Sequence, residues 1–227
     1  MKRIFFSKLH KREGNGGYTL VELIVSIAIL GVVMVGAFAL MTSGGNQFAR
    51  INGRIDLQYA AQQALSHMGQ EVIDTDAGMV YETAAKADGS GPDKDYIMLV
   101  DRKVTGSDKE YTVHTYVLED GKIYYNEAAY SGSLPTNVGT VKQNTVNAGH
   151  ILAEHVTALT FTPTAVSKPT DTGTVELVKS LKIEMTMERR KQTYEGSQVT
   201  SLRNRVLHGE SLSALESALN PPAPAAP

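Results

Sequence analysis

The chain contains no cysteine. This absence excludes a disulfide framework, a thiol nucleophile and a cysteine-ligated metal. If the protein is exported, its core must therefore be stabilised by packing alone. With 227 residues, of which 42% are hydrophobic and 20% are charged, the chain has the composition of a globular protein. Its length suits one sizeable domain with appendages.

The charges are unevenly distributed along the chain. Residues 1–17 hold five basic side chains and one acidic one, so they carry +4, and the net charge of −2 becomes −6 without them. An acidic body does not favour contact with the phosphate backbone of nucleic acids. We therefore expect no direct nucleic-acid partner.

Charged side chains are missing altogether from residues 23–41, a run of 19 apolar or small residues. As a helix with about 1.5 Å rise per residue, the run would extend roughly 28 Å, close to the hydrocarbon thickness of a bilayer. The next charged residue after Glu22 is Arg50, so the flanking basic residues lie on the N-terminal side. This pattern predicts one membrane-spanning helix with a cytoplasmic N-terminus and an exported remainder.

Two common kinds of segment would explain such a run: a plain signal-anchor helix and a cleaved secretory signal peptide. The second has support in Ala37-Phe38-Ala39, a small-x-small site near the end of the run. Neither requires Glu22 at the start of the run. A carboxylate costs about 2.5–3.5 kcal/mol at mid-bilayer, and less near the edge. Glu22 therefore indicates a further function for this segment.

The segment Gly16-Gly17-Tyr18-Thr19-Leu20-Val21-Glu22-Leu23-Ile24-Val25 contains the end of a basic leader in glycine, an aromatic residue, Thr-Leu-x-Glu and the start of the apolar stretch. This pattern has a specific resemblance to the type III signal of type IV prepilins and pseudopilins. The resemblance implies that a prepilin peptidase, a membrane aspartyl enzyme, cleaves between Gly17 and Tyr18 and methylates the new N-terminus at Tyr18. Glu22 would be the acidic residue of the motif.

Physical reasoning agrees with these implied roles. Glycine before the cut lets a protease approach the backbone closely. Cleavage creates an amine at Tyr18, one helical turn from Glu22, and a buried carboxylate needs a partner. The resemblance implies that the amine of a neighbouring subunit is this partner, so that Glu22 sets the axial register. Packing in the membrane and in the filament is expected of Leu23, Ile24, Ile27, Leu30, Gly31, Met34, Phe38 and Met41.

The apolar run departs from the family pattern at one position. Many members have a proline late in this helix, where the present chain has Ala39. Gly31, Gly36 and Gly44-Gly45 remain as weak points, each costing up to ~1 kcal/mol of helix stability relative to alanine. Local melting of the helix during assembly is compatible with these glycines, but no proline kink indicates it.

Helical periodicity continues beyond the apolar run, with one slip near Gln58. The apolar residues of this part are Phe48, Ile51, Ile55, Ala61, Leu65, Met68 and Val72. We expect one long helix over 18–75, with a membrane and filament stem (18–42) and an amphipathic part (46–74). Gly44-Gly45 is the place for a bend. Two separate helices are the alternative.

The remainder of the chain predicts β-structure. Strands are expected at 96–100, 111–118 and 156–161, and Asp120-Gly121 is a hairpin signal. Leu181, Ile183, Met185 and Met187 alternate with polar residues, as in a half-buried strand, and 192–206 are expected to pair back onto it. Loops are expected at 86–95 and 131–149.

Together these patterns predict an α+β, pilin-like fold, in which the distal half of a long N-terminal helix packs on an antiparallel β-sheet. The expected divisions are a leader (1–17), the long helix (18–75), a β-rich head (76–208) and a flexible Pro/Ala-rich tail (209–227). Within the tail, 211–219 can form a short helix, whereas 220–227 should be extended. The stretches 116–126, 151–161 and 201–205 weakly resemble minor pilins and pseudopilins.

No constellation of catalytic residues is present. His150 and His155 lack an acidic metal-binding pattern nearby and are interpreted as structural. The loop that holds Asp88, Asp93 and Asp95 could bind calcium, but its spacing is not that of an EF-hand, and a solvated loop is favoured. We expect no enzyme activity, no cofactor and no metal.

The sequence thus favours a minor pilin or pseudopilin, a structural subunit of a type IV pilus-like filament. Expected partners are the prepilin peptidase, other pilin or pseudopilin subunits, the plasma (inner) membrane and an assembly platform protein. The subunit would first be a single-pass membrane protein with an exported head, then part of an extracellular or envelope-spanning filament. The alternative is a membrane-anchored or secreted binding protein outside any filament. Pili, type II secretion and DNA uptake all use such subunits, and the sequence does not choose among them.

Overall fold

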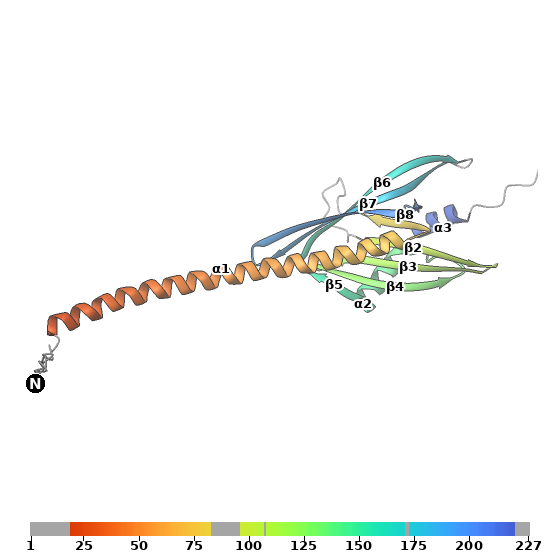
Figure 1. Cartoon of the computed structure of the whole chain (residues 1–227). Coiled ribbons are helices and arrows are strands. Elements are labelled where there is room, and N and C mark those ends of the chain that lie inside the picture. Colours follow the sequence, from red (N-terminus) through yellow and green to blue (C-terminus); the bar gives the residue numbers. More distant parts are fainter. Residues whose placement is uncertain (1–18, 83–95, 107, 171–172, 221–227) are drawn as a thin grey trace, which may run out of the picture. The chain divides into compact units, whose positions relative to one another are not determined.

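The computed structural model describes residues 19–82, 96–106, 108–170 and 173–220. The chain divides into two units, residues 1–49 and 50–227. Helix α1 (Leu20–Asp74) begins in the first unit and ends in the second, where it is followed by a β-rich head (Figure 1). Helical structure is continuous through Gly44-Gly45. One long helix, rather than two, is therefore confirmed.

The head is built on one sheet of eight strands among the described residues, in the order β5-β4-β3-β2-β1-β8-β7-β6. The strands are β1 (Gly78–Glu82), β2 (Tyr96–Thr105), β3 (Asp108–Glu119), β4 (Lys122–Ser131), β5 (His150–Glu154), β6 (Val156–Thr170), β7 (Gly173–Arg189) and β8 (Gln192–His208). Neighbours pair antiparallel, except that β1 meets β8 in a short parallel contact at Gly78–Leu207 and Met79–His208. Short β1 thus joins two antiparallel halves.

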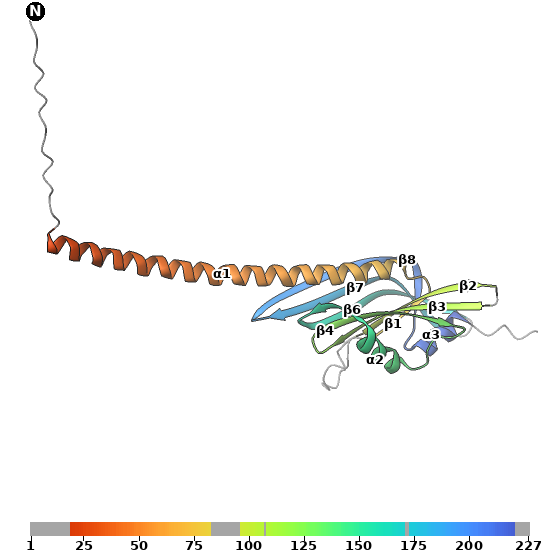
Figure 2. The same ribbon diagram turned by 90° about the horizontal axis from the view of Figure 1, so that it is seen from below.

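Helices cover both faces of the sheet. Alternate residues of a strand point to opposite faces, so Ile97 and Leu99 of β2 join the core under α1. Met98 and Val100 join a second core under α2 (Val138–Ala148) and α3 (Leu212–Leu219). Figure 2 shows α1 on one side of the sheet and the two short helices on the other. Burial on both faces explains why 96–100 is a continuous apolar run.

The C-terminal half of α1 packs on the sheet through one stripe of small and apolar residues. The buried members are Leu57, Ala61, Ala64, Leu65, Met68, Gly69 and Val72. At Gly69 the approach is close enough that a Cβ atom would collide with the side-chain amide of Gln198. Small residues in the stripe therefore set the distance between helix and sheet.

The sequence interpretation misplaced the first residues of this stripe. Phe48, Ile51 and Ile55 were expected to lie on the same face as the residues from Ala61 onward, but Ile51 and Ile55 are 57% and 55% exposed. The buried stripe instead begins at Leu57. The break in period near Gln58 marks a change of helix face, because on an ideal helix residues 51 and 55 point about 120° away from residues 57 and 61.

Two hairpins have turns of two residues with positive φ at both positions. In the β3–β4 turn, Asp120 and Gly121 have φ of 50° and 72°, which confirms the expected hairpin. In the β7–β8 turn, Arg190 and Lys191 have φ of 51° and 64°. Such turns favour Asn-Gly or Asp-Gly, because other residues are strained in this region.

The expected loop at 131–149 is wrong for most of its length, because 138–148 form α2. The side chain of Asn137 caps this helix by accepting a hydrogen bond from the Thr140 N–H at 3.3 Å. Val141 and Thr145, four residues apart, are buried against the sheet. Glycine, asparagine and threonine have weak helix propensity, so packing rather than propensity accounts for this helix. The loop expected at 86–95 lies outside the described residues.

The expected helix at 211–219 is present as α3, but it belongs to the head. Its side chains Leu212 and Leu215 are fully buried. Arg102 donates a hydrogen bond to the Leu219 carbonyl at 2.8 Å, and Lys109 donates one to Asn220 Oδ1 at 2.6 Å. The division at residue 209 is therefore too early. Residues 221–227 lie outside the described part of the chain.

Truncation of Ile183 to alanine should destabilise the head. Ile183 on β7 is fully buried in the core under α1, so Ile183→Ala should lower the free energy of unfolding by about 2–5 kcal/mol. Ile151 on β5 is 48% exposed and provides a matched control, for which Ile151→Ala should cost less than about 1 kcal/mol. Urea denaturation of the two variants in detergent measures the difference, and equal losses would contradict this core.

Candidate functional site

The N-terminal motif lies at the start of α1. Thr19 precedes the helix, and its Oγ1 accepts a hydrogen bond from the Glu22 N–H at 3.2 Å. These two residues occupy the first and last positions of a capping-box sequence. Glu22 is the acidic residue of the first turn, where the helix dipole favours negative charge. The carboxylate thus stabilises the helix start in addition to any role in assembly. Gly17 and Tyr18, the expected cleavage and methylation site, lie outside the described residues.

The apolar side chains that follow Glu22 are exposed on every side of the helix. Exposure ranges from 49% at Val25 to 77% at Leu40, and nothing lies within 4 Å of a Cβ placed on Gly31. α1 is the one described helix long and apolar enough to cross a membrane, with a mean hydropathy of 2.8 over 18 residues. None of that window is buried. Exposed apolar surface of this extent indicates a lipid or protein partner.

Most of the residues expected to pack in the membrane or filament lie on one face of the helix. Spacings of three and four place six of them on one stripe: Leu23, Ile27, Leu30, Met34, Phe38 and Met41. Ile24 and Gly31, seven residues apart, lie beside that stripe, and Glu22 lies on its other side. Their role in packing stays a prediction, because their side chains have no cover within the described chain.

Comparison with known families supports this assignment of the N-terminal segment. A family model described as the prokaryotic N-terminal methylation motif matches residues 14–38. The match covers the expected cleavage site, Glu22 and most of the apolar run, and it supports a type IV prepilin-like protein. Curated proteins and solved structures give no significant match to the chain. The head is therefore interpreted from its own geometry.

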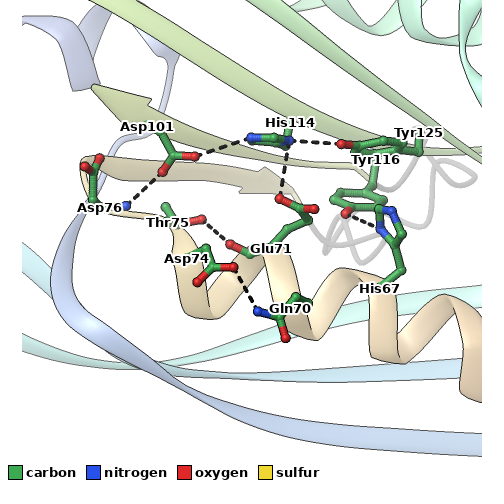
Figure 3. A network of polar contacts seen from close by, with 10 residues as sticks. All are labelled: His67, Gln70, Glu71, Asp74, Thr75, Asp76, Asp101, His114, Tyr116 and Tyr125. Carbon is green, nitrogen blue, oxygen red and sulfur yellow. Dashed lines mark hydrogen bonds and ion pairs between the residues drawn. The ribbon is translucent and has the colours of Figure 1, made fainter. Parts of the chain in front are cut away.

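The head contains a polar network that the sequence analysis did not find (Figure 3). At its centre, His114 of β3 lies between two carboxylates, with 3.3 Å from Nε2 to Asp101 Oδ2 of β2 and 3.4 Å from Nδ1 to Glu71 Oε2 of α1. Its Nδ1 also lies 3.0 Å from the Tyr125 hydroxyl. The His114 side chain is only 11% exposed. In the sequence, the one signal for this network was a histidine at a strand position that faces the helix.

Further hydrogen bonds extend this network around the end of α1. The Asp76 N–H donates to Asp101 Oδ1 at 2.9 Å, and the Arg102 N–H donates to Asp76 Oδ1 at 3.0 Å. This reciprocal pair holds the segment after α1 against β2. Nearby, His67 of α1 shares a 2.8 Å hydrogen bond with the Tyr116 hydroxyl. The network therefore joins the helix to the sheet through polar contacts beside the apolar stripe.

The electrostatics of this polar network depend on His114. The last turn of α1 has no basic side chain, although negative charge is unfavourable at a helix C-terminus. Burial by itself lowers the pKa of His114, but the hydrogen bond to Asp101 and the charges of Glu71 and Glu127 outweigh burial and raise it. Burial, with the charges of Glu71 and Glu127, also raises the pKa of Tyr125 to about 12. Protonated His114 can thus bridge the two carboxylates.

This network is best explained as a structural joint. The groups are a histidine, carboxylates and tyrosine hydroxyls that satisfy one another, and His114 is nearly covered. Among the described residues, no three His, Asp or Glu side chains converge as metal ligands. The acidic loop that was considered for calcium lies outside those residues.

The raised pKa of His114 makes part of the stability dependent on pH. A group whose pKa is higher in the folded state stabilises most when it is protonated, so its contribution is complete below the unfolded value of 6.5 and declines as pH rises through the folded value. Urea titrations at several pH values should therefore show that His114→Gln is most destabilised, relative to the parent, below pH 6.5. His150→Gln, exposed on β5, is the control. A difference that does not vary with pH would exclude protonated His114 as the bridge.

Proposed function

We propose that this chain is a structural subunit of a type IV pilus-like filament. One observation carries the proposal: a prokaryotic N-terminal methylation motif is directly followed by a helix segment whose apolar side chains are exposed all round. Lipid can cover these side chains while the subunit waits in the membrane. The stems of other subunits can cover the same surface after assembly. A secretory signal peptide would be discarded, and its helix would need no such motif.

The proposed sequence of events follows from the charges and the apolar run. The basic leader holds the N-terminus on the cytoplasmic side while the head is exported. Cleavage after Gly17 removes the leader, and methylation leaves a cationic amine at Tyr18. When the stem leaves lipid for a bundle of stems, Glu22 becomes buried and needs an opposite charge. The amine of the adjoining subunit supplies this charge, and the pair sets the axial register.

We further infer a minor pilin or pseudopilin rather than a bulk subunit. The head that follows the stem is large, with eight described strands and two further helices. The segment after the stem is long for a bulk subunit, and this length favours a low-abundance one. Because Glu22 is present, the subunit can also accept another above it, so its position need not be the extreme tip.

Maturation at Gly17 can be tested by N-terminal sequencing and mass spectrometry of the protein from a host with a prepilin peptidase. The mature chain should begin at N-methylated Tyr18, and Gly17→Val should leave the leader attached, because a side chain at the cut blocks the close approach of the protease. A mature chain that begins at Leu40 would indicate a secretory signal peptide. An intact Met1 would indicate a plain anchor.

The role of Glu22 in register can be separated from processing. Glu22→Ala should still be cleaved and methylated but should be lost from sheared filaments, because the neighbouring amine then has no partner. Ser26→Ala is the matched control, since Ser26 lies one turn later and donates only to the Glu22 carbonyl within its own helix. Immunoblots of filament and membrane fractions measure both effects. Normal incorporation of Glu22→Ala would remove the register role.

A further inference from the structure

Five basic side chains lie on two segments that are in contact at the end of the head where α1 enters it. We call this group the basic collar; its members are Arg50, Arg54, Arg189, Arg190 and Lys191. The two segments are in contact, because Arg189 Nη1 lies 3.9 Å from Asp56 Oδ2 and a Cβ on Gly53 would lie 2.9 Å from Gln192 Oε1. Figure 2 shows the β7–β8 turn beside α1. All five cations are exposed.

The helix contributes its two arginines on a defined face. Arg50 and Arg54 precede Leu57 by seven and three residues, so they share its face of the helix. The helix face that packs on the sheet from Leu57 onward therefore carries two arginines in the turns just before Leu57. The two segments that form the collar, 50–56 and 188–192, contain two acidic side chains, Asp56 and Glu188, both exposed. Five cations against two carboxylates give these segments an excess of positive charge, although the body is acidic overall.

The β7–β8 turn contributes its cations at two positions whose backbone conformation does not favour them. Arg190 and Lys191 both have positive φ, a region in which L-residues with long side chains are strained. The β3–β4 turn has the same geometry but uses Asp120-Gly121, which suits it. The chain thus places two long cations where a better turn sequence exists. Strain that persists in this way points to a function of the side chains.

The position of the collar along the chain points to the membrane surface. Arg50 follows Met41, the last residue of the apolar run, by nine residues, which span about 14 Å as a helix. The headgroup layer adds about 5–8 Å beyond the hydrocarbon core. The remaining gap is within reach of a long side chain and of the Debye length, about 8 Å at physiological ionic strength. Anionic lipid attracts basic groups near its surface.

We propose that the basic collar binds anionic phospholipid headgroups on the exported face of the membrane and holds the head against the bilayer before assembly. The proposal rests on the membrane anchorage proposed above, but not on the filament step. The exposure of the cations and the short distance of Arg50 from the apolar run favour lipid over an acidic neighbouring subunit. The collar would release the head when the stem is drawn into the filament.

The absence of cysteine allows one specific label beside the collar. Thr193 is exposed two residues after Lys191, so Thr193→Cys can carry a fluorophore in the full chain reconstituted into vesicles. Energy transfer to a headgroup-labelled lipid should be higher in phosphatidylcholine vesicles that contain phosphatidylglycerol than in those that lack it. The rise should disappear at high NaCl. Transfer that does not depend on phosphatidylglycerol would overturn the proposal.

Two charge variants in the labelled background test the collar itself. Arg190→Asn with Lys191→Gly removes two cations while improving the turn, so the head stays folded and its melting temperature should not fall. This variant, and Arg50→Gln with Arg54→Gln, should each lose most of the rise caused by phosphatidylglycerol. The matched control is Lys103→Gln with Lys168→Gln, which removes two exposed cations near the β2–β3 and β6–β7 turns.

The remaining outcomes distinguish failure of the collar from failure of the anchor. An equal loss in the Lys103 and Lys168 control would assign the effect to overall charge and overturn the proposal. Collar variants that keep the lipid response but no longer enter filaments would assign the surface to a neighbouring subunit instead. Flotation of the vesicles tests the anchor separately: protein that does not float would contradict membrane anchorage, whereas floating protein without a lipid response would contradict only the collar.

Discussion

The apolar surface of the first part of α1 has to be covered, and the described chain supplies no cover for it. Each side chain there leaves much of its area exposed, and burial of apolar area is worth about 25 cal/mol per Å². An environment that covers the helix all round is therefore strongly favoured over water. A bilayer is one such environment, and a bundle of similar helices is another. Transfer between them requires little change in the helix itself.

One face of the second part of α1, unlike the first part, is covered by the chain's own sheet. The head-facing stripe uses alanine and glycine, as at Ala61, Ala64 and Gly69, which allow the backbone to approach the sheet closely. Polar contacts beside this stripe centre on His114 and join Glu71 of the helix to Asp101 of the sheet. Apolar packing supplies most of the attachment, while the network fixes its register, because its bonds require particular partners.

Sequence patterns were sufficient for the features that depend on local periodicity. The apolar run, the Asp120-Gly121 hairpin and the alternation from Leu181 to Met187 each follow from a spacing within a few residues. The N-terminal motif is likewise local, and the match at residues 14–38 covers it. The α+β architecture followed from these elements, since a long helix with one apolar stripe and several strands has few ways to bury both.

Features that depend on residues far apart in the chain were not predictable in the same way. α2 has weak intrinsic propensity and forms where Val141 and Thr145 can be buried by the sheet. The slip in helical period near Gln58 separates Ile51 and Ile55 from the later residues, but only the position of the sheet shows which of the two faces is buried. The carboxylate partners of His114 lie 43 residues before it on α1 and 13 before it on β2, and no spacing rule joins them.

The two tight hairpins show how one geometry can reflect different demands. At Asp120-Gly121 the residues suit the turn, so the local chain alone explains them. At Arg190-Lys191 they do not, and the explanation has to come from what the side chains face. The turn lies beside Gly53 and Asp56, where the apolar stripe of α1 has given way to Arg54 and Arg50. A strained turn and a helix face therefore supply the same kind of charge at the same place, and a solvated surface requires neither.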